Sequence, residues 1–354
     1  MTNQSLLLDV RNLKTYFPLV QGTVRAVNGV DFTVKRGQTV GLVGESGCGK
    51  SVLARSILRI EPSPGKIVEG EIHFHRQLSG RTNGADAGNL VDLAKLDPMG
   101  PEIRRIRGAE ISMVFQEPMT SLSPVHTIGN QITEAIRLHQ QVSNEQARQQ
   151  AIEMLALVNM PHPGRTVDRY PHQLSGGMRQ RAMIAMALSC RPSLLIADEP
   201  TTALDVTTQA QILTLMRNLQ NELGMAIIFI THDLGVIAQM VDYVIVMYLG
   251  EVVEMADVDT IFYNPKHPYT QSLLRSIPRL GRKSTQGASA RLTAIRGSVP
   301  DPYSIPQGCP FHPRCRHVIR GVCDQRTPPF LETEPGHKVR CVLYEPAVAT
   351  PAAA

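Results

Sequence analysis

The segment Gly44–Ser51 combines residue types and a spacing that suit it to bind phosphate. It reads Gly-Glu-Ser-Gly-Cys-Gly-Lys-Ser and fits the pattern G-x-x-x-x-G-K-[ST]. Glycines let backbone N–H groups turn toward an anion, and the helix expected to follow directs its dipole at the same anion. We expect Lys50 to reach the β- and γ-phosphates of a nucleotide, Ser51 to ligate Mg²⁺, and Cys48 to fill space rather than react. The predicted contacts with the nucleotide are Gly44, Glu45, Ser46, Gly47, Cys48, Gly49, Lys50, Ser51 and Val52.

Two adjacent carboxylates follow the apolar run Leu194–Ala197. Such a run predicts a buried strand, and ligands of α/β proteins bind at the carboxyl ends of buried strands. We expect Asp198 to hold Mg²⁺ through water. Glu199 is then placed to orient or deprotonate an attacking water molecule.

The elements that must position these groups can be predicted from the pattern of apolar residues. Residues 6–36 alternate apolar and polar side chains and predict an antiparallel sheet. Short apolar runs at 38–43, Leu194–Ala197 and Ala226–Ile230 predict buried strands, with helices at 51–60 and over most of 126–190. Strands alternating with helices indicate a largely parallel α/β core. A polar insert around 77–92 and a linker at 280–290 interrupt the pattern.

Further motifs extend the phosphate loop into an ordered set. They are Gln116 in Val-Phe-Gln-Glu-Pro, Leu174-Ser-Gly-Gly-Met178, Ala203-Leu-Asp205 and Thr231-His-Asp233. From Tyr16 to Gly250 their order and spacing resemble the nucleotide-binding subunits of ABC transporters. The resemblance implies an α/β fold, the P-loop ABC-type nucleotide-binding domain, with a parallel core sheet, an antiparallel β subdomain and a helical subdomain at about 118–190.

The resemblance also implies roles for individual residues around ATP. Gln116 would touch Mg²⁺ and the attacking water and sense a membrane partner, and His232 would contact the γ-phosphate. Tyr16 is the candidate to stack on adenine.

A second set of residues would act across a dimer, again by resemblance. Ser175, Gly176 and Gly177 would grip ATP held by a second subunit, by the logic of anion binding at a helix N-terminus. Asp205 would lie at the interface between the two subunits. Phosphoryl transfer would then depend on positioning and charge neutralisation.

Later segments resemble one subfamily, the dipeptide and oligopeptide importer ATPases. They are 116–124, 170–178, Asn264–Thr270 and Gly308–Cys315. The resemblance implies a translocase subunit that pairs with a homologous ATPase (identical or different), two transmembrane permeases and an extracytoplasmic substrate-binding protein. It places the chain peripherally on the cytoplasmic face of the inner membrane. The cargo stays open among dipeptides, oligopeptides, nickel complexes, glutathione and oligosaccharides.

The last fifth of the chain differs from the rest, so we expect an ATPase domain at 1–275 and a small Cys-rich C-terminal domain at 276–354. Residues 281–354 hold ten Lys/Arg and five Asp/Glu, which accounts for the net charge of +5. Clustered thiols in a reducing compartment favour metal binding over disulfides. The candidate ligands of a [4Fe–4S] cluster, or of Zn²⁺ as the alternative, are Cys309, Cys315, Cys323 and Cys341. Four neighbouring arginines could offset the charge of an anionic cluster: Arg314, Arg316, Arg326 and Arg340.

Composition excludes several classes and leaves two alternatives. The longest apolar run is the eight residues Tyr243–Gly250, whereas a membrane-spanning helix needs about 20. The N-terminus carries Asp9 and Arg11 and does not have the pattern of a signal peptide. The basic tail suggests a soluble ABC ATPase acting on nucleic acid or ribosomes, but its lack of interleaved aromatics argues against a nucleic-acid partner. The cysteines suggest an ATP-dependent redox- or iron-responsive regulator.

Overall fold

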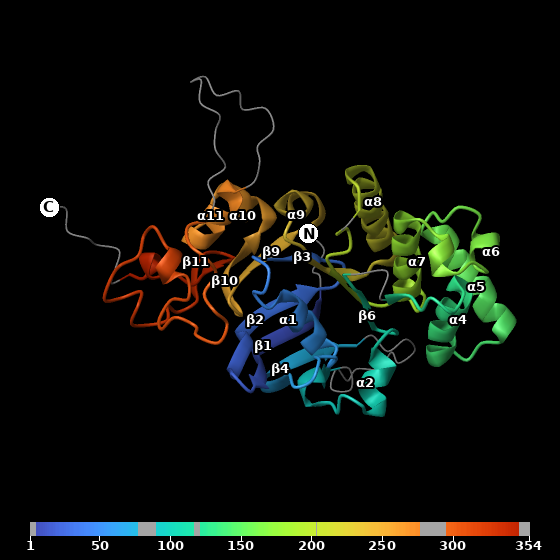
Figure 1. The fold of residues 1–354 in the computed structure, drawn as a ribbon, viewed down its shortest axis with the longest axis horizontal. Helices are drawn as coiled ribbons and strands as arrows, with labels where there is room; N and C mark the ends of the chain where they lie inside the picture. Colours follow the sequence, from blue (N-terminus) through green and yellow to red (C-terminus); the bar gives the residue numbers. More distant parts are fainter. Residues whose placement is uncertain (1–4, 77–89, 117–120, 203, 277–294, 347–354) are drawn as a thin grey trace, which may run out of the picture.

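The computed structural model describes residues 5–76, 90–116, 121–202, 204–276 and 295–346. The predicted linker at 280–290 and most of the predicted insert at 77–92 lie outside the described residues, as does 117–120 of the segment 116–124. Figure 1 shows a central body of sheets between a group of helices at one end and the C-terminal segment at the other.

A large mixed sheet forms the centre of the molecule. Its strand order is β11-β12-β10-β9-β3-β8-β7-β6, and the five strands from β9 to β6 run parallel. The bounds of these strands are β3 Thr39–Val43, β6 Ile111–Val114, β7 Leu194–Asp198, β8 Ala226–Ile230, β9 Tyr243–Tyr248, β10 Glu251–Asp257, β11 Leu331–Glu334 and β12 His337–Val339. Strands β3, β7 and β8 are buried along their whole length, as their continuous apolar runs predict.

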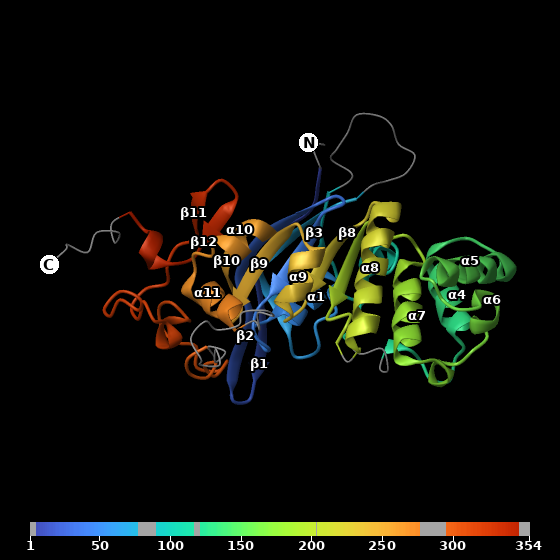
Figure 2. The ribbon, with the colours of Figure 1, turned by 90° about the horizontal axis from the view of Figure 1, so that it is seen from above.

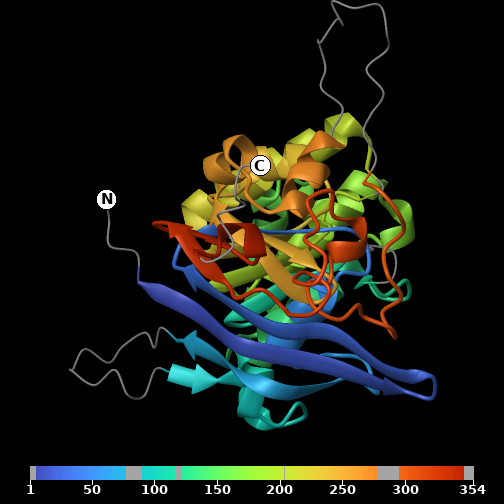
Figure 3. The ribbon, with the colours of Figure 1, turned by 90° about the vertical axis from the view of Figure 1, so that its left-hand side faces the viewer.

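A second, antiparallel sheet has the order β2-β1-β4-β5 and confirms the strands expected at 6–36. Its strands are β1 Leu6–Leu19, β2 Gly22–Lys35, β4 Lys66–His75 and β5 Leu90–Asp92, followed by helix α2 Pro101–Ile106. The long β1–β2 hairpin runs along one side of the molecule (Figure 3). The pairing of β1 with β2 shifts register at several points, including between Thr15 and Tyr16. Such a bulge changes which side chains face inward.

The helical subdomain occupies the end of the molecule opposite the C-terminal segment (Figure 2). It contains α4 Ile128–His139, α5 Asn144–Leu157, α6 Pro163–Thr166 and α7 Gly176–Leu188. Local capping sets the start of two helices, because the side chains of Thr127 and Ser143 accept hydrogen bonds from Asn130 N and Gln146 N. These helices confirm the expected helical subdomain.

The remaining helices cover the central sheet. They are α1 Lys50–Ile57, α8 Val206–Leu223, α9 Leu234–Met240, α10 Val258–Tyr263 and α11 Pro268–Arg275. Within the described part of the chain, no helix is long and apolar enough to span a bilayer.

The C-terminal segment differs from the separate domain that its composition suggested. Its hairpin β11–β12 pairs with β10 and extends the central sheet, and Val339 lies opposite Glu254. Phe311 belongs to the main hydrophobic core. In Figures 1 and 2 the segment lies beside β10, α10 and α11. Phe311 is therefore buried against the cassette and not in a separate core of the segment.

Candidate active site

The phosphate loop connects β3 to α1, the order that its motif requires. Gly49 caps α1 with a left-handed φ of 102°, which glycine adopts without strain. A Cβ on Gly49 would lie 2.0 Å from the carbonyl oxygen of Ala26, and one on Gly44 would lie 2.3 Å from the carbonyl oxygen of Met247. Neighbouring backbone therefore requires glycine at both positions.

Lys50 turns back into this loop instead of extending into solvent. Its Nζ donates to the carbonyl oxygens of Gly44, at 2.8 Å, and Glu45, at 3.1 Å. The residue is buried. An ammonium group held over a ring of backbone amides provides the positive charge that a polyphosphate needs.

Ser51 and Asp198 meet across the cleft between α1 and β7. Ser51 Oγ donates to Asp198 Oδ1 at 3.0 Å. Burial raises the pKa of Asp198 above its ordinary value, and the charge of Glu199 adds to this rise while the hydrogen bond from Ser51 opposes it. A hydroxyl and a carboxylate are the oxygen ligands that Mg²⁺ prefers, so this pair fits the predicted metal site.

Glu199 lies at the centre of a small polar network at the end of β7. Gln116 Nε2 donates to its Oε2 at 3.2 Å, Thr202 Oγ1 donates to the same oxygen at 2.9 Å, and His232 Nδ1 lies 3.1 Å from its Oε1. The backbone of Glu199 has a left-handed φ of 48°, an uncommon conformation for a non-glycine residue, with its amide bonded to Ile230 O. The network brings the three predicted catalytic residues together.

The network also sets the protonation of Glu199. Burial acts to raise its pKa, but the hydrogen bonds with His232 and Thr202 outweigh burial and leave the pKa below the usual value. Glu199 is therefore ionised at neutral pH, as a residue that accepts a proton from water must be. Glu199 and its neighbour Asp198 thus have pKa values displaced in opposite directions.

A cleft of about 350 Å³ opens beside these groups. Residues from six separate parts of the chain line it: Phe17, Val24, Arg25, Ala26, Ser46, Gly47, Cys48, Gly49, Lys50, Ser51, Val52, Gln116, Glu199, Leu249, Gly250, Pro302 and Ile305. Of the predicted loop contacts, Gly44 and Glu45 do not line the cleft. Pro302 and Ile305 were not predicted, because no motif marks them and only the fold of the C-terminal segment brings them here.

The aromatic residue that lines the cleft is Phe17. Tyr16, predicted to stack on adenine, lies outside this lining, and its stacking role stays a prediction. Tyr16 directs its hydroxyl to Asn28 Oδ1 at 2.7 Å, while Asn28 Nδ2 donates to Glu251 on β10 at 2.9 Å. Asn28 therefore connects the two sheets, and Tyr16 bonds to it from within the antiparallel sheet. The register shift between Thr15 and Tyr16 explains why alternation alone could not identify the residue facing the cleft.

The motif Ser175–Gly177 opens α7 and lies outside the cleft of its own chain. Ser175 Oγ caps the helix by accepting from Met178 N at 3.4 Å. A Cβ on Gly177 would lie 2.7 Å from Thr208 Cγ2. Asp205 caps α8 and accepts from Thr208 N at 2.9 Å. The two predicted interface elements are thus in contact with each other.

The four C-terminal cysteines line one small pocket together with His267, Phe311 and Pro328. None is in a disulfide. Burial raises the pKa of Cys309 to about 11 and that of Cys341 to about 12, and the other cysteines add to both rises. Two of the arginines expected to offset a charge here have other partners, because Arg314 pairs with Glu45 and Arg326 with Glu345.

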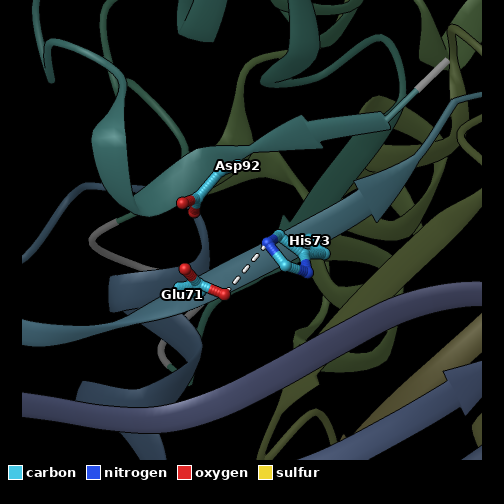
Figure 4. A group of neighbouring side chains, drawn as sticks. All are labelled: Glu71, His73 and Asp92. Atoms are coloured by element: carbon cyan, nitrogen blue, oxygen red, sulfur yellow. Dashed lines mark ion pairs between the residues drawn. The ribbon is translucent and has the colours of Figure 1, made fainter. Parts of the chain in front are cut away.

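Glu71, His73 and Asp92 form a separate group on β4 and β5 (Figure 4). Among the described residues, they alone bring three ligand atoms of metal-binding type within 4.8 Å of one another. Lys95 Nζ lies 2.9 Å from Asp92 and 3.6 Å from Glu71. Because lysine already supplies the positive charge, we assign this group to an ion-pair network that joins the two strands.

Comparison with protein families gives two matches along the chain. Residues 27–202 match the family described as ABC transporter. Residues 253–323 match the family described as oligopeptide/dipeptide transporter, C-terminal region.

Curated relatives align over nearly the full length. A probable peptide ABC transporter ATP-binding protein of Sinorhizobium fredii is 51% identical, covering 95% of this chain and 94% of its own. The oligopeptide transport ATP-binding protein AppD of Bacillus subtilis is 49% identical, covering 96% and 98%. The dipeptide transport ATP-binding protein DppD of the same species is 47% identical, covering 96% and 95%.

Solved structures show the same fold. The ATP-binding cassette MJ0796, in a dimeric post-hydrolysis state with ADP and Pi, has a TM-score of 0.60 and 28% identity, covering 71% of this chain and 99% of its own. The protein cbiO1 of Clostridium perfringens, part of the ABC transporter complex cbiONQ, has a TM-score of 0.59 and 26% identity, covering 74% and 92%.

Proposed function

The chain belongs to the ATP-binding proteins of the peptide ABC transporter family, and from this premise we propose that it hydrolyses MgATP to drive peptide import through partner subunits. The main support for this proposal is the set of side chains that contact the carboxylate of Glu199. Gln116, Thr202 and His232 all contact its carboxylate, beside the cleft that Lys50 and the glycine loop line.

Each group has a chemical task in this reaction. Lys50 and the loop amides bind the β- and γ-phosphates and neutralise their charge. Ser51 and Asp198 would hold Mg²⁺, with Gln116 as the third predicted ligand. Glu199 orients the attacking water and accepts its proton, while His232 holds Glu199 and contacts the γ-phosphate. Positioning and charge neutralisation provide most of the rate enhancement for phosphoryl transfer.

The functional unit is a dimer of ATPase subunits. The support is the position of Ser175–Gly177, which lies outside the cleft of its own chain yet presents helix-terminal amides of the kind that bind phosphate. In a head-to-tail pair these amides and Asp205 reach the ATP of the other subunit. The similar cassette MJ0796 was solved as a dimer.

The other partners follow from the family. Two permeases provide the membrane-spanning segments, an extracytoplasmic protein delivers the substrate, and this chain lies peripherally on the cytoplasmic face of the membrane. Coupling would pass through the region Gln116–Pro124 to a cytoplasmic helix of a permease. The relatives are named for peptides, dipeptides and oligopeptides, so peptides are the proposed cargo.

Replacement of Glu199 tests the ATPase assignment. E199Q should bind MgATP within a few-fold of wild type and lose at least about 100-fold in kcat, because a general base contributes 10²–10⁴-fold. E222Q makes the same change on an exposed carboxylate of α8 and should behave as wild type. Hydrolysis by E199Q at the wild-type rate would refute the role of Glu199.

Transport is tested on the assembled importer. Membrane vesicles that carry this chain with its permeases and binding protein should take up a labelled dipeptide or oligopeptide only when MgATP is present. E199Q should abolish uptake. ATP-independent uptake, or uptake of salts and sugars but no peptide, would contradict the proposed cargo.

We also propose that the four C-terminal cysteines would hold a [4Fe–4S] cluster, with Zn²⁺ as the alternative. All four line one pocket, which supports a shared ligand. Four thiolates are the ligand set of a [4Fe–4S] cluster and also of a structural zinc ion. The cluster would supply a cross-link that stabilises the tail.

Anaerobic purification followed by iron, sulfide and zinc analysis tests this assignment. Iron and sulfide should be present in wild type and lost in C323S. C190S changes a cysteine at the end of α7, away from the pocket, and should retain them. Zinc without iron would refute the cluster.

A further inference from the structure

Arg314 connects the C-terminal segment to the phosphate loop. Its guanidinium donates to both carboxylate oxygens of Glu45, with Nη1 at 2.6 Å and Nη2 at 2.9 Å. Only 4% of its side chain is exposed, and its Nε donates to Arg296 O at 3.0 Å. A two-bond contact of this kind is directional and strong compared with exposed ion pairs. It joins residues 269 positions apart in sequence.

Glu45 transmits this contact to the groups that hold the nucleotide. Its carbonyl oxygen accepts from Lys50 Nζ at 3.1 Å, and its amide donates to the hydroxyl of Tyr269 at 2.8 Å. Arg314 and Tyr269 therefore fix the Glu45 side chain and backbone from outside the loop. Neither residue lines the nucleotide cleft.

The same segment is also built into the cysteine pocket. Phe311, between Cys309 and Arg314, lines that pocket and is 1% exposed. Its ring packs against Tyr248 and Tyr269 at centroid distances of 5.3 and 5.4 Å. Packed aromatic rings and a partly buried ion pair thus form one contiguous connection between the cysteines and the phosphate loop.

We propose that Arg314 is a positioning residue of the MgATP site: it holds Glu45 so that the phosphate loop is preorganised, and it links nucleotide binding to the conformation of the Cys309–Cys315 segment. The inference deepens the proposed function and rests on it. Linkage is reciprocal. If the bound conformation of the Cys309–Cys315 segment strengthens MgATP binding, then MgATP binding must stabilise that conformation by the same free energy.

Nucleotide affinity provides the first test, on the full chain. R314Q and E45Q should each raise the Kd for MgATP about tenfold, within the range typical of coupled sites. The double variant E45Q/R314Q should be no worse than either single variant, because the two residues act through each other. At saturating MgATP the kcat of R314Q should change less than about twofold, since Arg314 touches no reacting group. R314K keeps the charge but not the two-bond geometry and should give an intermediate Kd.

A matched control is available in the same tail. Arg326 forms a two-bond pair with Glu345 at 3.0 and 2.5 Å on the surface, so R326Q should bind MgATP as wild type does. If R314Q does not fold, R314K and the charge-neutral double variant still test the coupling. A Kd for R314Q within twofold of wild type, or additive effects in the double variant, would overturn the proposal.

Hydrogen–deuterium exchange provides the second test. A non-hydrolysable ATP analogue with Mg²⁺ should slow amide exchange across 309–315 in the wild-type chain and should not do so in R314Q. Equal protection in both proteins, or none in the wild type, contradicts the linkage. Failure of the wild-type chain to bind the nucleotide at all would instead refute the proposed function.

Discussion

His232 Nδ1 lies 3.1 Å from Glu199 Oε1, which joins the residues that follow two adjacent parallel strands, β8 and β7. Thr202 Oγ1 donates to the other oxygen of the same carboxylate at 2.9 Å. Both carboxylate oxygens of Glu199 are therefore bonded by side chains from outside its strand. The carboxylate is held in one orientation and in its charged form.

Removal of the Thr202 hydroxyl should shift the pH profile of the ATPase. The hydrogen bond lowers the pKa of Glu199, so T202V should raise that pKa. The acid limb of kcat, where Glu199 becomes protonated and inactive, should then move to higher pH by up to about one unit. A pH–rate profile between pH 4 and 9 measures the shift. T214V removes a hydroxyl that bonds only within α8 and should leave the profile unchanged.

Replacement of Ser51 should weaken Mg²⁺ binding more than nucleotide binding. Ser51 Oγ contacts Asp198 Oδ1, and both oxygens are proposed metal ligands. S51A should raise the Mg²⁺ concentration needed for half-maximal ATPase activity about tenfold, equivalent to about 1.4 kcal/mol. S51T keeps the hydroxyl and should remain close to wild type. An unchanged Mg²⁺ dependence in S51A would exclude Ser51 as a ligand.

The ring of Phe17 should contribute to nucleotide affinity, whereas the hydroxyl of Tyr16 should not. F17A removes the aromatic ring that lines the cleft and should raise the Kd for ATP about five- to tenfold, because stacking on a base is worth roughly 1–3 kcal/mol. Y16F removes only the bond to Asn28 and should bind ATP normally. Fluorescence titration measures both. A larger loss in Y16A than in F17A would identify Tyr16 as the stacking residue.

Phe311 should be important for the stability of the whole chain. It is buried in the main core against Tyr248 and Tyr269, so F311A should lower the free energy of unfolding by about 3 kcal/mol. Urea denaturation monitored by circular dichroism measures the change. Tyr263 is 87% exposed, and Y263A should cost less than about 0.5 kcal/mol. If F311A leaves the cassette as stable as wild type, the tail is not part of its core.

The sequence by itself determined those parts of the site in which the functional residues and the strand or helix that positions them are neighbours in the chain. The phosphate loop needs a strand, glycines and a helix in immediate succession, and Gly44–Ser51 contains that order. The run Leu194–Ala197 likewise predicts both a buried strand and the position of Asp198 and Glu199 at its end. These predictions succeed because they concern residues that are adjacent in the chain, and a few backbone angles determine the relative positions of such residues.

Only the tertiary structure decided the contacts between distant segments. A register shift inside β1 turned Phe17 into the cleft and Tyr16 toward Asn28, and alternation cannot reveal a bulge. The tail looked separate by composition, yet β12 pairs with β10 and Arg314 binds Glu45. Strands and charged residues that are far apart in sequence meet only when the chain closes long loops between them. No local sequence pattern predicts which of these distant segments come together.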